Sequence, residues 1–278
     1  MNARGRVMIF WDYDTQWGAD RSRSGRKPWG MAEFVNTDRI MDLLAARQLQ
    51  SVFACVGAAA QPGVRPYHDP AQIRRMHAAG HEVGSHSLEH DWLPGLGPAQ
   101  LKETLRRSRE SLEQCIGHRV TTFVPPWNQP YDYLRVGSVS LSERSEVRSA
   151  ERTDVRRLCA ALAETGYTFA RLAFRNAFRR IVEAVSGREH PRRAKVSSLM
   201  GVRFVLLNTP AGFDTPAREM VQQVAANGGI AVVWAHPHSL TADNPQNERY
   251  LVPFLDELAA LRAAKKVDVV CPRDLAHE

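Results

Sequence analysis

Cysteine is scarce in this sequence. Four cysteines occur in 278 residues, and Cys55, Cys115, Cys159 and Cys271 lie far apart along the chain. No two of them form a C-x-x-C pair, so their spacing fits neither a zinc site built from cysteines nor the disulfide framework of a small secreted domain. We therefore expect reduced thiols, most of them buried.

Long apolar runs and internal repeats are also missing. The first residues, MNARGRVMIFWDYD, lack the apolar region and the small-residue cleavage site of a secretion signal. The apolar runs are all far shorter than the roughly 20 residues that a membrane-spanning helix needs. We expect a cytoplasmic protein that has no membrane span, although peripheral contact with a membrane surface is compatible with its charge. Its oligomeric state is not encoded in any motif.

Positive charge is concentrated in one segment. The chain has a formal net charge of +7, and residues 135–203 contain 15 Lys or Arg against 7 Asp or Glu. This segment could attract a phosphorylated substrate, an anionic membrane surface or nucleic acid, or it could be a solvated helical face. Nucleic acid is the weakest of these readings, because the segment lacks interleaved aromatic residues and any known binding motif.

Strands and helices are predicted to alternate along most of the chain. Short apolar runs predict buried strands, and apolar residues at helical spacing between capping signals predict helices. Residues 15–30 and 187–198 are expected to be loops. The predicted strands are 9–14, 51–57, 81–86, 119–124, 202–208, 229–236 and 267–270, and the predicted helices are 37–48, 69–80, 101–116, 153–166, 171–185, 215–229 and 249–265. Such alternation predicts an α/β barrel of parallel strands.

Unusual residues follow four of the predicted strands. The segments IFWDYD, EVGSH, TTFVPPW and AVVWAH each end in polar or aromatic side chains. In a parallel barrel, the C-terminal ends of the strands lie at the same mouth, and functional groups gather there. We therefore expect these four segments to converge on one site.

Two aspartates, Asp12 and Asp14, end the first of these strands. Side chains at i and i+2 point to the same side of a strand, so the two carboxylates come together. A bound cation, a split in pKa between the two groups, or exposure to water would relieve their repulsion. The first two of these would make a chemical site.

Two histidines, His86 and His90, lie four residues apart in GSHSLEH. On a helical turn this spacing puts both imidazoles on one face, where they can bind one metal ion. The preceding His81 and Glu82 do not indicate a zincin, because HEVGSH lacks the H-E-x-x-H spacing. Together with Asp14, the two histidines would form a three-ligand site with open positions, suited to Zn²⁺, Co²⁺ or Fe²⁺.

The general acid and base come from the remaining titratable groups of the motifs. Asp12 is on the same side as the expected ligands and is not needed as one, so it can take a proton from an attacking water. His236, at the end of GIAVVWAH, is the candidate general acid, with His238 as its competitor. Pro237 separates the two histidines, and we expect only one of them to face the mouth of the barrel.

Four motifs in this order resemble those of the metal-dependent polysaccharide deacetylases, the NodB-like carbohydrate esterases that include chitooligosaccharide and peptidoglycan deacetylases. The family's first motif supplies an aspartate base and an aspartate ligand, matched here by FWDYD. Its H-[ST]-x-x-H motif is matched by HSLEH, its third motif by VPPW (residues 124–127), and its final motif by AVVWAHPH. The similarity covers roughly residues 6–130 and 200–275, and the basic segment between them is weakly matched.

The resemblance implies a fold, a reaction and a cofactor. The fold would be a distorted (β/α)7-8 barrel forming a single catalytic domain over residues 1–278. The reaction would be hydrolysis of an N-acetyl group on an amino sugar, with one divalent metal, zinc first and cobalt or iron as alternatives. Trp11, Pro126, Trp127 and His238 would contact the substrate, because aromatic rings beside the motifs can stack on a sugar.

The sequence departs from the family in two places. The family's aspartates are often adjacent, whereas Tyr13 separates Asp12 from Asp14, and the i, i+2 arrangement still puts both on one side. The third motif usually begins with an arginine that holds the catalytic aspartate, and Val124 stands there instead. Another residue must therefore orient Asp12.

Several functions fit these observations. A cytoplasmic location favours a nucleotide-linked or lipid-linked intermediate of surface polysaccharide assembly, such as O-antigen, whose phosphates could meet the basic segment. A second hypothesis is hydrolysis of another C–N bond, as in cyclic amides such as allantoin. A third is a carbohydrate-binding relative that lost its metal and its activity together with the motif arginine.

Overall fold

The protein is described from a computed structural model, whose described residues are 4–21, 27–128, 154–173 and 193–275. Within these residues nine strands form one sheet, in the order β6-β7-β5-β4-β3-β2-β1-β8, with β9 beside the start of β1. All pairings are parallel except β6 with β7. The strands are β1 (Gly5–Tyr13), β2 (Val52–Cys55), β3 (Glu82–Ser85), β4 (Thr122–Phe123), β5 (Phe169–Leu172), β6 (Ser197–Leu199), β7 (Val202–Leu206), β8 (Ile230–Ala235) and β9 (Val267–Val269).

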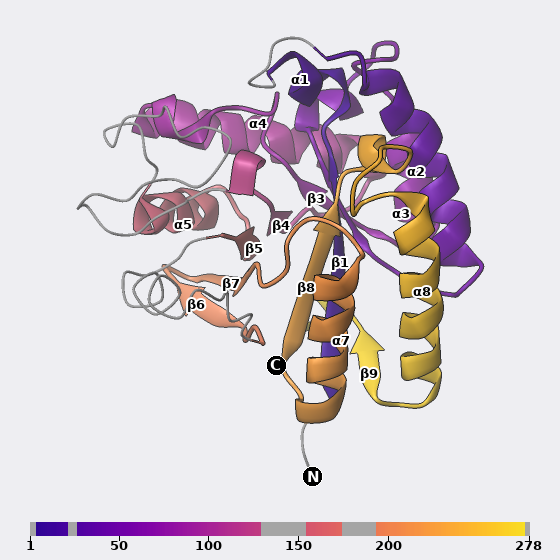
Figure 1. The fold of residues 1–278 in the computed structure, drawn as a ribbon. Coiled ribbons are helices and arrows are strands. Elements are labelled where there is room, and N and C mark those ends of the chain that lie inside the picture. The colour runs from indigo at the N-terminus through magenta and orange to yellow at the C-terminus, as the bar shows by residue number, and fades with distance from the viewer. Residues whose placement is uncertain (1–3, 22–26, 129–153, 174–192, 276–278) are drawn as a thin grey trace.

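Helices surround the curled sheet on its outer face (Figure 1). They are α1 (Thr15–Asp20), α2 (Gly30–Ala45), α3 (Pro70–Ala78), α4 (Pro98–Ile116), α5 (Val155–Glu164), α7 (Thr215–Asn227) and α8 (Glu248–Ala263). Among the described residues, no helix is both long and apolar enough to cross a membrane.

The two faces of β1 belong to two separate apolar clusters. Its residues Val7, Ile9, Trp11 and Tyr13 join the large core between sheet and helices. Met8 and Phe10 point the other way, into a smaller cluster of side chains from β2, β5, β7 and β8. This alternation follows from the two-residue period of a strand. The next inward-facing position on β1 is residue 12, so the fold delivers Asp12 to the mouth of the barrel.

Side chains, rather than a continuous ladder, join the two ends of the sheet. Asn208, just after β7, donates from Nδ2 to the carbonyl of Ile230 on β8 and accepts from the amide of Val232, both at 2.9 Å. The hydroxyl of Thr209 donates to the carbonyl of Val232 at 2.8 Å. The backbone of Ala194 also bridges to Ile230. The expected distorted barrel is thereby confirmed.

Several predicted boundaries hold because their capping signals act as expected. The carboxylate of Asp69 accepts from the amide of Gln72 and caps α3, which begins at Pro70. Gly117 ends α4 with φ of 67°, in the left-handed region that favours glycine. Three of the four cysteines are buried, the fourth is half-buried, and all are free thiols, as predicted.

Other local predictions were wrong. The stretch 15–30, expected to be a loop, contains α1, and α2 begins at Gly30 rather than at Thr37. Arg171, expected to start a helix, lies in β5, and the last two residues of the loop expected over 187–198 begin β6 (Ser197–Leu199). The rest of the helix predicted over 171–185 falls outside the described residues. In these cases sheet pairing and packing overrode the local sequence preference.

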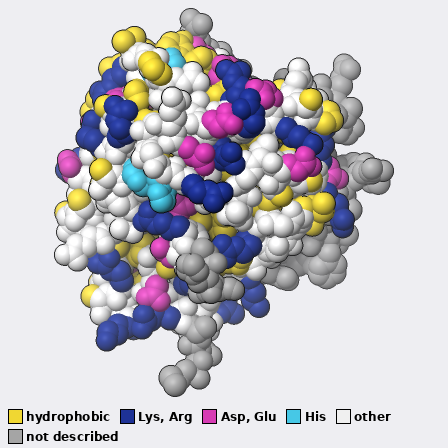
Figure 2. All heavy atoms as spheres, turned by 180° about the vertical axis from the view of Figure 1, so that it is seen from behind, with side chains coloured by type: hydrophobic (Ala, Val, Ile, Leu, Met, Phe, Trp, Pro, Cys, Tyr) yellow, Lys and Arg dark blue, Asp and Glu magenta, His cyan; other side chains and the backbone are white. Residues whose placement is uncertain are grey.

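Much of the basic segment also lies outside the described residues. Five of its arginines are described. Arg171 is buried in the barrel, Arg157 donates to the carbonyl of Leu96, Arg193 donates to the carbonyls of Asn227 and Gly228 at the end of α7, Arg203 donates to the carbonyl of Leu275, and Arg156 is exposed on α5. On the face shown in Figure 2, Lys and Arg side chains are interspersed with Asp and Glu. Four of the five arginines therefore serve the fold or the barrel mouth rather than an open surface patch.

Candidate active site

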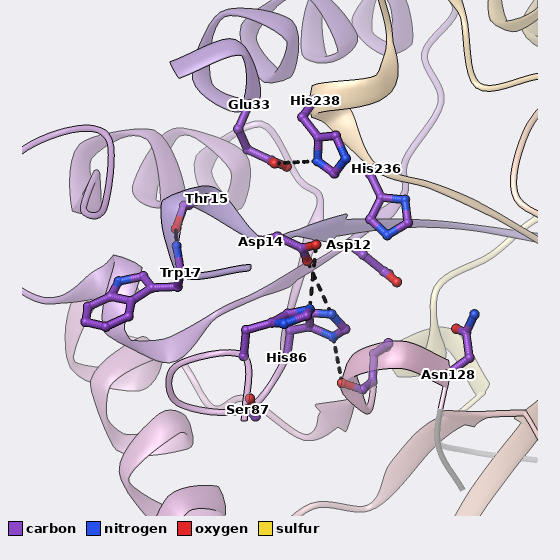
Figure 3. Close-up of polar contacts among 12 residues, drawn as sticks. Asp12, Asp14, Thr15, Trp17, Glu33, His86, Ser87, Asn128, His236 and His238 are labelled. Carbon is purple, nitrogen blue, oxygen red and sulfur yellow. Dashed lines mark hydrogen bonds and ion pairs between the residues drawn. The ribbon is translucent and has the colours of Figure 1, made fainter. Parts of the chain in front are cut away.

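Asp12 and Asp14 lie at the mouth of the barrel, where β1 ends and α1 begins (Figure 3). Both side chains are nearly inaccessible, with exposed fractions of 2% for Asp12 and 4% for Asp14. Directly after them, Thr15 turns the chain with φ of 56°, a conformation that is uncommon for a residue with a branched side chain. Two buried carboxylates so close in sequence require positive or hydrogen-bonding partners.

Asp14 faces His86 and His90. The Nε2 atom of His86 lies 3.3 Å from Oδ1 of Asp14, and Nε2 of His90 lies 3.6 Å from Oδ2. One donor atom from each of the three residues lies within 4.8 Å of the other two, and all three residues are buried. The structure thus brings together the three residues that the sequence predicted as metal ligands.

The two histidines do not meet on a helix, contrary to the sequence prediction. Residues 86–90 form a compact turn in which Ser87 and His90 have left-handed φ values of 65° and 57°. The carboxylate of Asp91 accepts from the amides of Leu88 and Glu89 at 3.1 and 3.0 Å, and the amide of Asp91 donates to the Ser87 hydroxyl at 2.7 Å. These bonds satisfy the backbone that a helix would have satisfied, so the turn can aim both rings at Asp14.

The distances and protonation of this trio fit a bound divalent metal. Two ligand atoms that each lie about 2.1 Å from a tetrahedral metal are about 3.4 Å apart, which matches the separations around Asp14. Oδ1 of Asp14 is buried and has no hydrogen-bond partner among the described residues, which leaves it available as a ligand. Burial lowers the pKa of His90 to about 3, so its ring is neutral, as metal binding requires.

His86 is oriented by the backbone of the third motif. Its Nδ1 atom donates to the carbonyl of Val124 at 2.8 Å, which leaves Nε2 as the unprotonated nitrogen facing Asp14. Burial lowers the pKa of His86, but its close contact with Asp14 and the charges of both aspartates raise it above its ordinary value. A bound metal ion would take the place of the proton that this raised pKa favours, because a ligand imidazole must be neutral.

Asp12 has a different partner, Arg171 of β5. Two nitrogens of the guanidinium donate to the two carboxylate oxygens at 2.8 and 2.6 Å, in the bidentate geometry that gives the strongest ion pairs. Burial alone would raise the pKa of Asp12. The positive charge of Arg171 is the main opposing effect, and the net result is a pKa below the ordinary value of an aspartate. The sequence prediction missed Arg171 because it placed the residue in a helix, although an arginine inside the apolar run FARL signals a buried partner.

The final motif places its two histidines differently (Figure 3). His236 points toward the two aspartates, and its charge contributes to the lowered pKa of both Asp12 and Asp14. Its Nδ1 atom lies 3.1 Å from Oε1 of Gln246, which also accepts from its backbone amide at 2.7 Å. Gln246 thus holds the ring at the mouth.

His238 points toward α2. Its Nδ1 atom shares a hydrogen bond with Oε2 of Glu33 at 3.0 Å, and its ring stacks on Trp29 with centroids 4.3 Å apart. Burial lowers the pKa of His238, and burial together with the charge of Asp14 raises the pKa of Glu33 well above its ordinary value. Both shifts favour the neutral form of the group concerned. Sequence reasoning missed Glu33 because it took α2 to begin at Thr37.

Two of the four expected substrate-binding residues lie where a substrate could touch them. Trp127 is partly exposed and packs its ring edge to face with His90, with centroids 4.3 Å apart, and His238 is also partly exposed. Trp11 is fully buried against Phe53 and Phe213 on the outer face of β1. Pro126 is buried as well. The structure therefore does not bring Trp11 or Pro126 to a surface that a substrate can reach.

Comparison with known proteins agrees with this geometry. The polysaccharide deacetylase family model matches residues 31–138, which include the HSLEH and VPPW motifs, while FWDYD and AVVWAHPH lie outside the matched range. A protein from Mycobacterium smegmatis assigned as a polysaccharide deacetylase superposes with a TM-score of 0.63 at 16% identity, covering 99% of this chain and 90% of the other.

Two further solved structures share the fold. The Bc1960 peptidoglycan N-acetylglucosamine deacetylase superposes with a TM-score of 0.51 at 14% identity, covering 99% of this chain and 89% of its own. A mutant of BA3943, a family 4 carbohydrate esterase pseudoenzyme, superposes with a TM-score of 0.50 at 15% identity, covering 99% of this chain and 68% of its own. The family model over residues 31–138 and the shared fold agree with the resemblance to the NodB-like polysaccharide deacetylases that the four motifs indicated.

Proposed function

We propose that this protein is a metal-dependent hydrolase that removes the N-acetyl group from an amino sugar. One observation carries the proposal. Asp12, bound by Arg171, and Asp14, facing His86 and His90, lie side by side in one buried mouth. One carboxylate is thus arranged for metal binding and its neighbour for proton transfer.

The metal's part follows from the three ligands. When bound to Asp14, His86 and His90, a divalent ion polarises a carbonyl oxygen and lowers the pKa of water. Zinc suits a site with one carboxylate and two imidazoles, and cobalt or iron would fit the same donors. The proposed ion is therefore zinc, with the other two as alternatives.

The protein's own groups move the protons. Asp12 takes a proton from water as the water oxygen attacks the acetamide carbon. His236 gives a proton to the nitrogen as the C–N bond breaks, because an amine is a poor leaving group until it is protonated. The products are acetate and the free amine of the sugar. His238, engaged with Glu33 and Trp29, is assigned to the wall of the site rather than to proton transfer.

The proposed substrate is an N-acetylated sugar. Trp127 supplies a partly exposed aromatic ring beside His90, and aromatic rings bind the apolar faces of sugars. We further propose a cytoplasmic, nucleotide-linked or lipid-linked intermediate of surface polysaccharide assembly, such as O-antigen. That proposal rests on the charge of residues 135–203, and any phosphate would have to meet members of this segment other than the four arginines already engaged by the fold.

The hypothesis of an inactive relative loses its main support. It depended on Val124 replacing the motif arginine, and Asp12 has an arginine partner in Arg171. Hydrolysis of a cyclic amide has no observation in its favour beyond the shared metal chemistry. Both alternatives are covered by the same assay.

The experiment is acetate release by zinc-loaded protein from a panel of N-acetylated sugars. The panel contains free N-acetylglucosamine, its oligomers, a peptidoglycan fragment and a nucleotide-linked form, with allantoin as the cyclic amide. Asp12→Asn protein serves as the control for contaminating hydrolases. Acetate from at least one sugar, absent with the control, supports the proposal. Ring opening of allantoin without acetate release, or no reaction with any member, would contradict it.

A further inference from the structure

The guanidinium of Arg171 is held in one orientation. It lies between the rings of Phe10 and Trp234, 5.3 and 5.0 Å from their centroids. Besides its two bonds to Asp12, it donates to Oδ1 of Asn128 at 3.2 Å. The exposed fraction of the residue is 1%. A side chain fixed by two rings, a carboxylate and an amide has little freedom to turn.

Among the described residues, Arg171 is the cationic side chain that contacts the Asp12 carboxylate directly. Both carboxylate oxygens are engaged by the guanidinium, so the plane of the carboxylate is set by the plane of the arginine. Lysine could supply the charge but not the two parallel bonds. The orientation of Asp12 is therefore determined from β5, a strand that none of the four motifs includes.

The sheet register explains how β5 can do this. Thr122 pairs with Phe169 and Phe123 with Ala170, so continuing the register places Val124 beside Arg171. Val124 belongs to the inner cluster with Phe169, and Arg171 follows Phe169 by two residues on the same face. Residues 124 and 171 thus occupy adjacent inward positions, about one strand spacing of 4.8 Å apart.

We propose that Arg171 is a positioning residue for Asp12, and that it does from β5 what an arginine at position 124 would do from the adjacent inward position. The kinetic test of this inference rests on the proposed function, whereas the coupling between Arg171 and Asp12 can be tested without it. Arg171 touches no reacting atom, and it acts by fixing where the Asp12 carboxylate points. Misplacing a catalytic group by about 1 Å can cost about 10²-fold in rate.

The test combines truncation, relocation and a double-mutant cycle. Arg171→Met should lower kcat about 10²-fold with little change in KM and with metal content retained. Combined with Asp12→Asn, it should cause no further loss in kcat, because both changes remove the same function. Arg171→Val with Val124→Arg should recover at least tenfold over Arg171→Val alone. Arg203→Met, which removes an arginine that binds the carbonyl of Leu275, is the matched control.

The contrary results are equally clear. Turnover within twofold of wild type in Arg171→Met, or losses that multiply in the double variant, would overturn the proposal. If wild type releases no acetate, the proposed function fails by itself, and urea unfolding of the same cycle still tests the pair. Arg171→Met should then lower the urea midpoint of unfolding by less in the Asp12→Asn background than in the wild-type protein. Equal losses in both backgrounds would show that the two side chains are not coupled.

Discussion

Asp12 and Asp14 both lie at the C-terminal end of β1, at the mouth of the barrel, yet their carboxylates have separate partners. Asp12 is bound by Arg171 at 2.6 and 2.8 Å, and Asp14 faces the Nε2 atoms of two histidines at 3.3 and 3.6 Å. The repulsion that two adjacent carboxylates would feel is therefore offset by an arginine on one side and by two histidines on the other. This separation is consistent with the different roles proposed for the two aspartates.

The buried and exposed tryptophans should respond differently to substitution. Trp11→Phe should leave KM unchanged and cost little stability, because the Trp11 indole N–H is buried without a hydrogen-bond partner among the described residues. Trp127→Ala should raise KM by roughly fivefold, since stacking on one aromatic ring is worth about 1 kcal/mol. Steady-state kinetics on a confirmed substrate checks both. A raised KM in Trp11→Phe would contradict the assignment of Trp11 to the core.

The sequence predicted the site well where the chemistry is local. Asp12 points inward because of the two-residue period of β1, and Asp14 follows directly after the strand, before α1. The final motif ends a buried strand, as predicted. The structure brings the three predicted metal ligands within 4.8 Å of one another, although the turn that carries the two histidines was not predicted. The possible ligands follow from the identities of the aspartate and the two histidines. The shape of the turn depends on the hydrogen bonds from the amides of Leu88 and Glu89 to Asp91, which could not be predicted from the spacing of the histidines.

Arg171 and Glu33 could not be predicted because their partners are distant in sequence. Arg171 lies 159 positions from Asp12, and their contact depends on the register between β4 and β5. Glu33 lies 205 positions from His238, in the first turn of a helix that was predicted to begin only at Thr37. A pattern within one segment carries no information about which strand or helix will lie opposite it.

Substitutions of the two histidines of the final motif should have different kinetic effects. His236→Gln should lower kcat by roughly 10² to 10⁴, the usual contribution of a positioned general acid. His238→Gln should act mainly on KM, because that ring is held by Glu33 and Trp29 at the wall of the site. Measuring kcat and KM for both variants separates the roles. A larger kcat loss in His238→Gln would reverse the assignment.

Asp91 should control metal affinity without being a ligand. Asp91→Ala removes the acceptor for the amides of Leu88 and Glu89 and so loosens the turn that carries His90. Supporting residues of this kind are worth about 10- to 100-fold in metal affinity. Competition against a chelator of known affinity measures the change. Glu89→Gln, at a partly exposed side chain outside the trio, is the control and should bind metal normally.

His81 should make the fold sensitive to acid. Burial, with a smaller effect from the charge of Arg273, lowers the pKa of His81 to about 4, and its Nδ1 atom accepts from the amide of Ser51. The unfolded chain binds a proton near pH 6.5 and the folded chain does not, so this contribution to stability is present above pH 6.5 and is lost as pH falls toward 4.

The size of this effect can be measured by urea unfolding. Between pH 7.5 and pH 5, His81 should account for about 2 kcal/mol of the stability lost on acidification. His81→Gln keeps an acceptor but cannot take up the proton, so the variant should lose about that much less over the same range. Equal losses in both proteins would show that His81 is not the responsible group.

The most direct test of the account is to measure metal content and turnover together in Asp12→Asn and Asp14→Asn. Asp14→Asn should lose metal and activity together, because a neutral amide is a poor ligand for a divalent cation. Asp12→Asn should retain about one metal ion per chain and lose roughly 10²- to 10⁴-fold in kcat. Elemental analysis and acetate release on the same preparations decide the matter. Near-normal turnover in Asp12→Asn, or full metal content in Asp14→Asn, would contradict the division of labour between these two carboxylates.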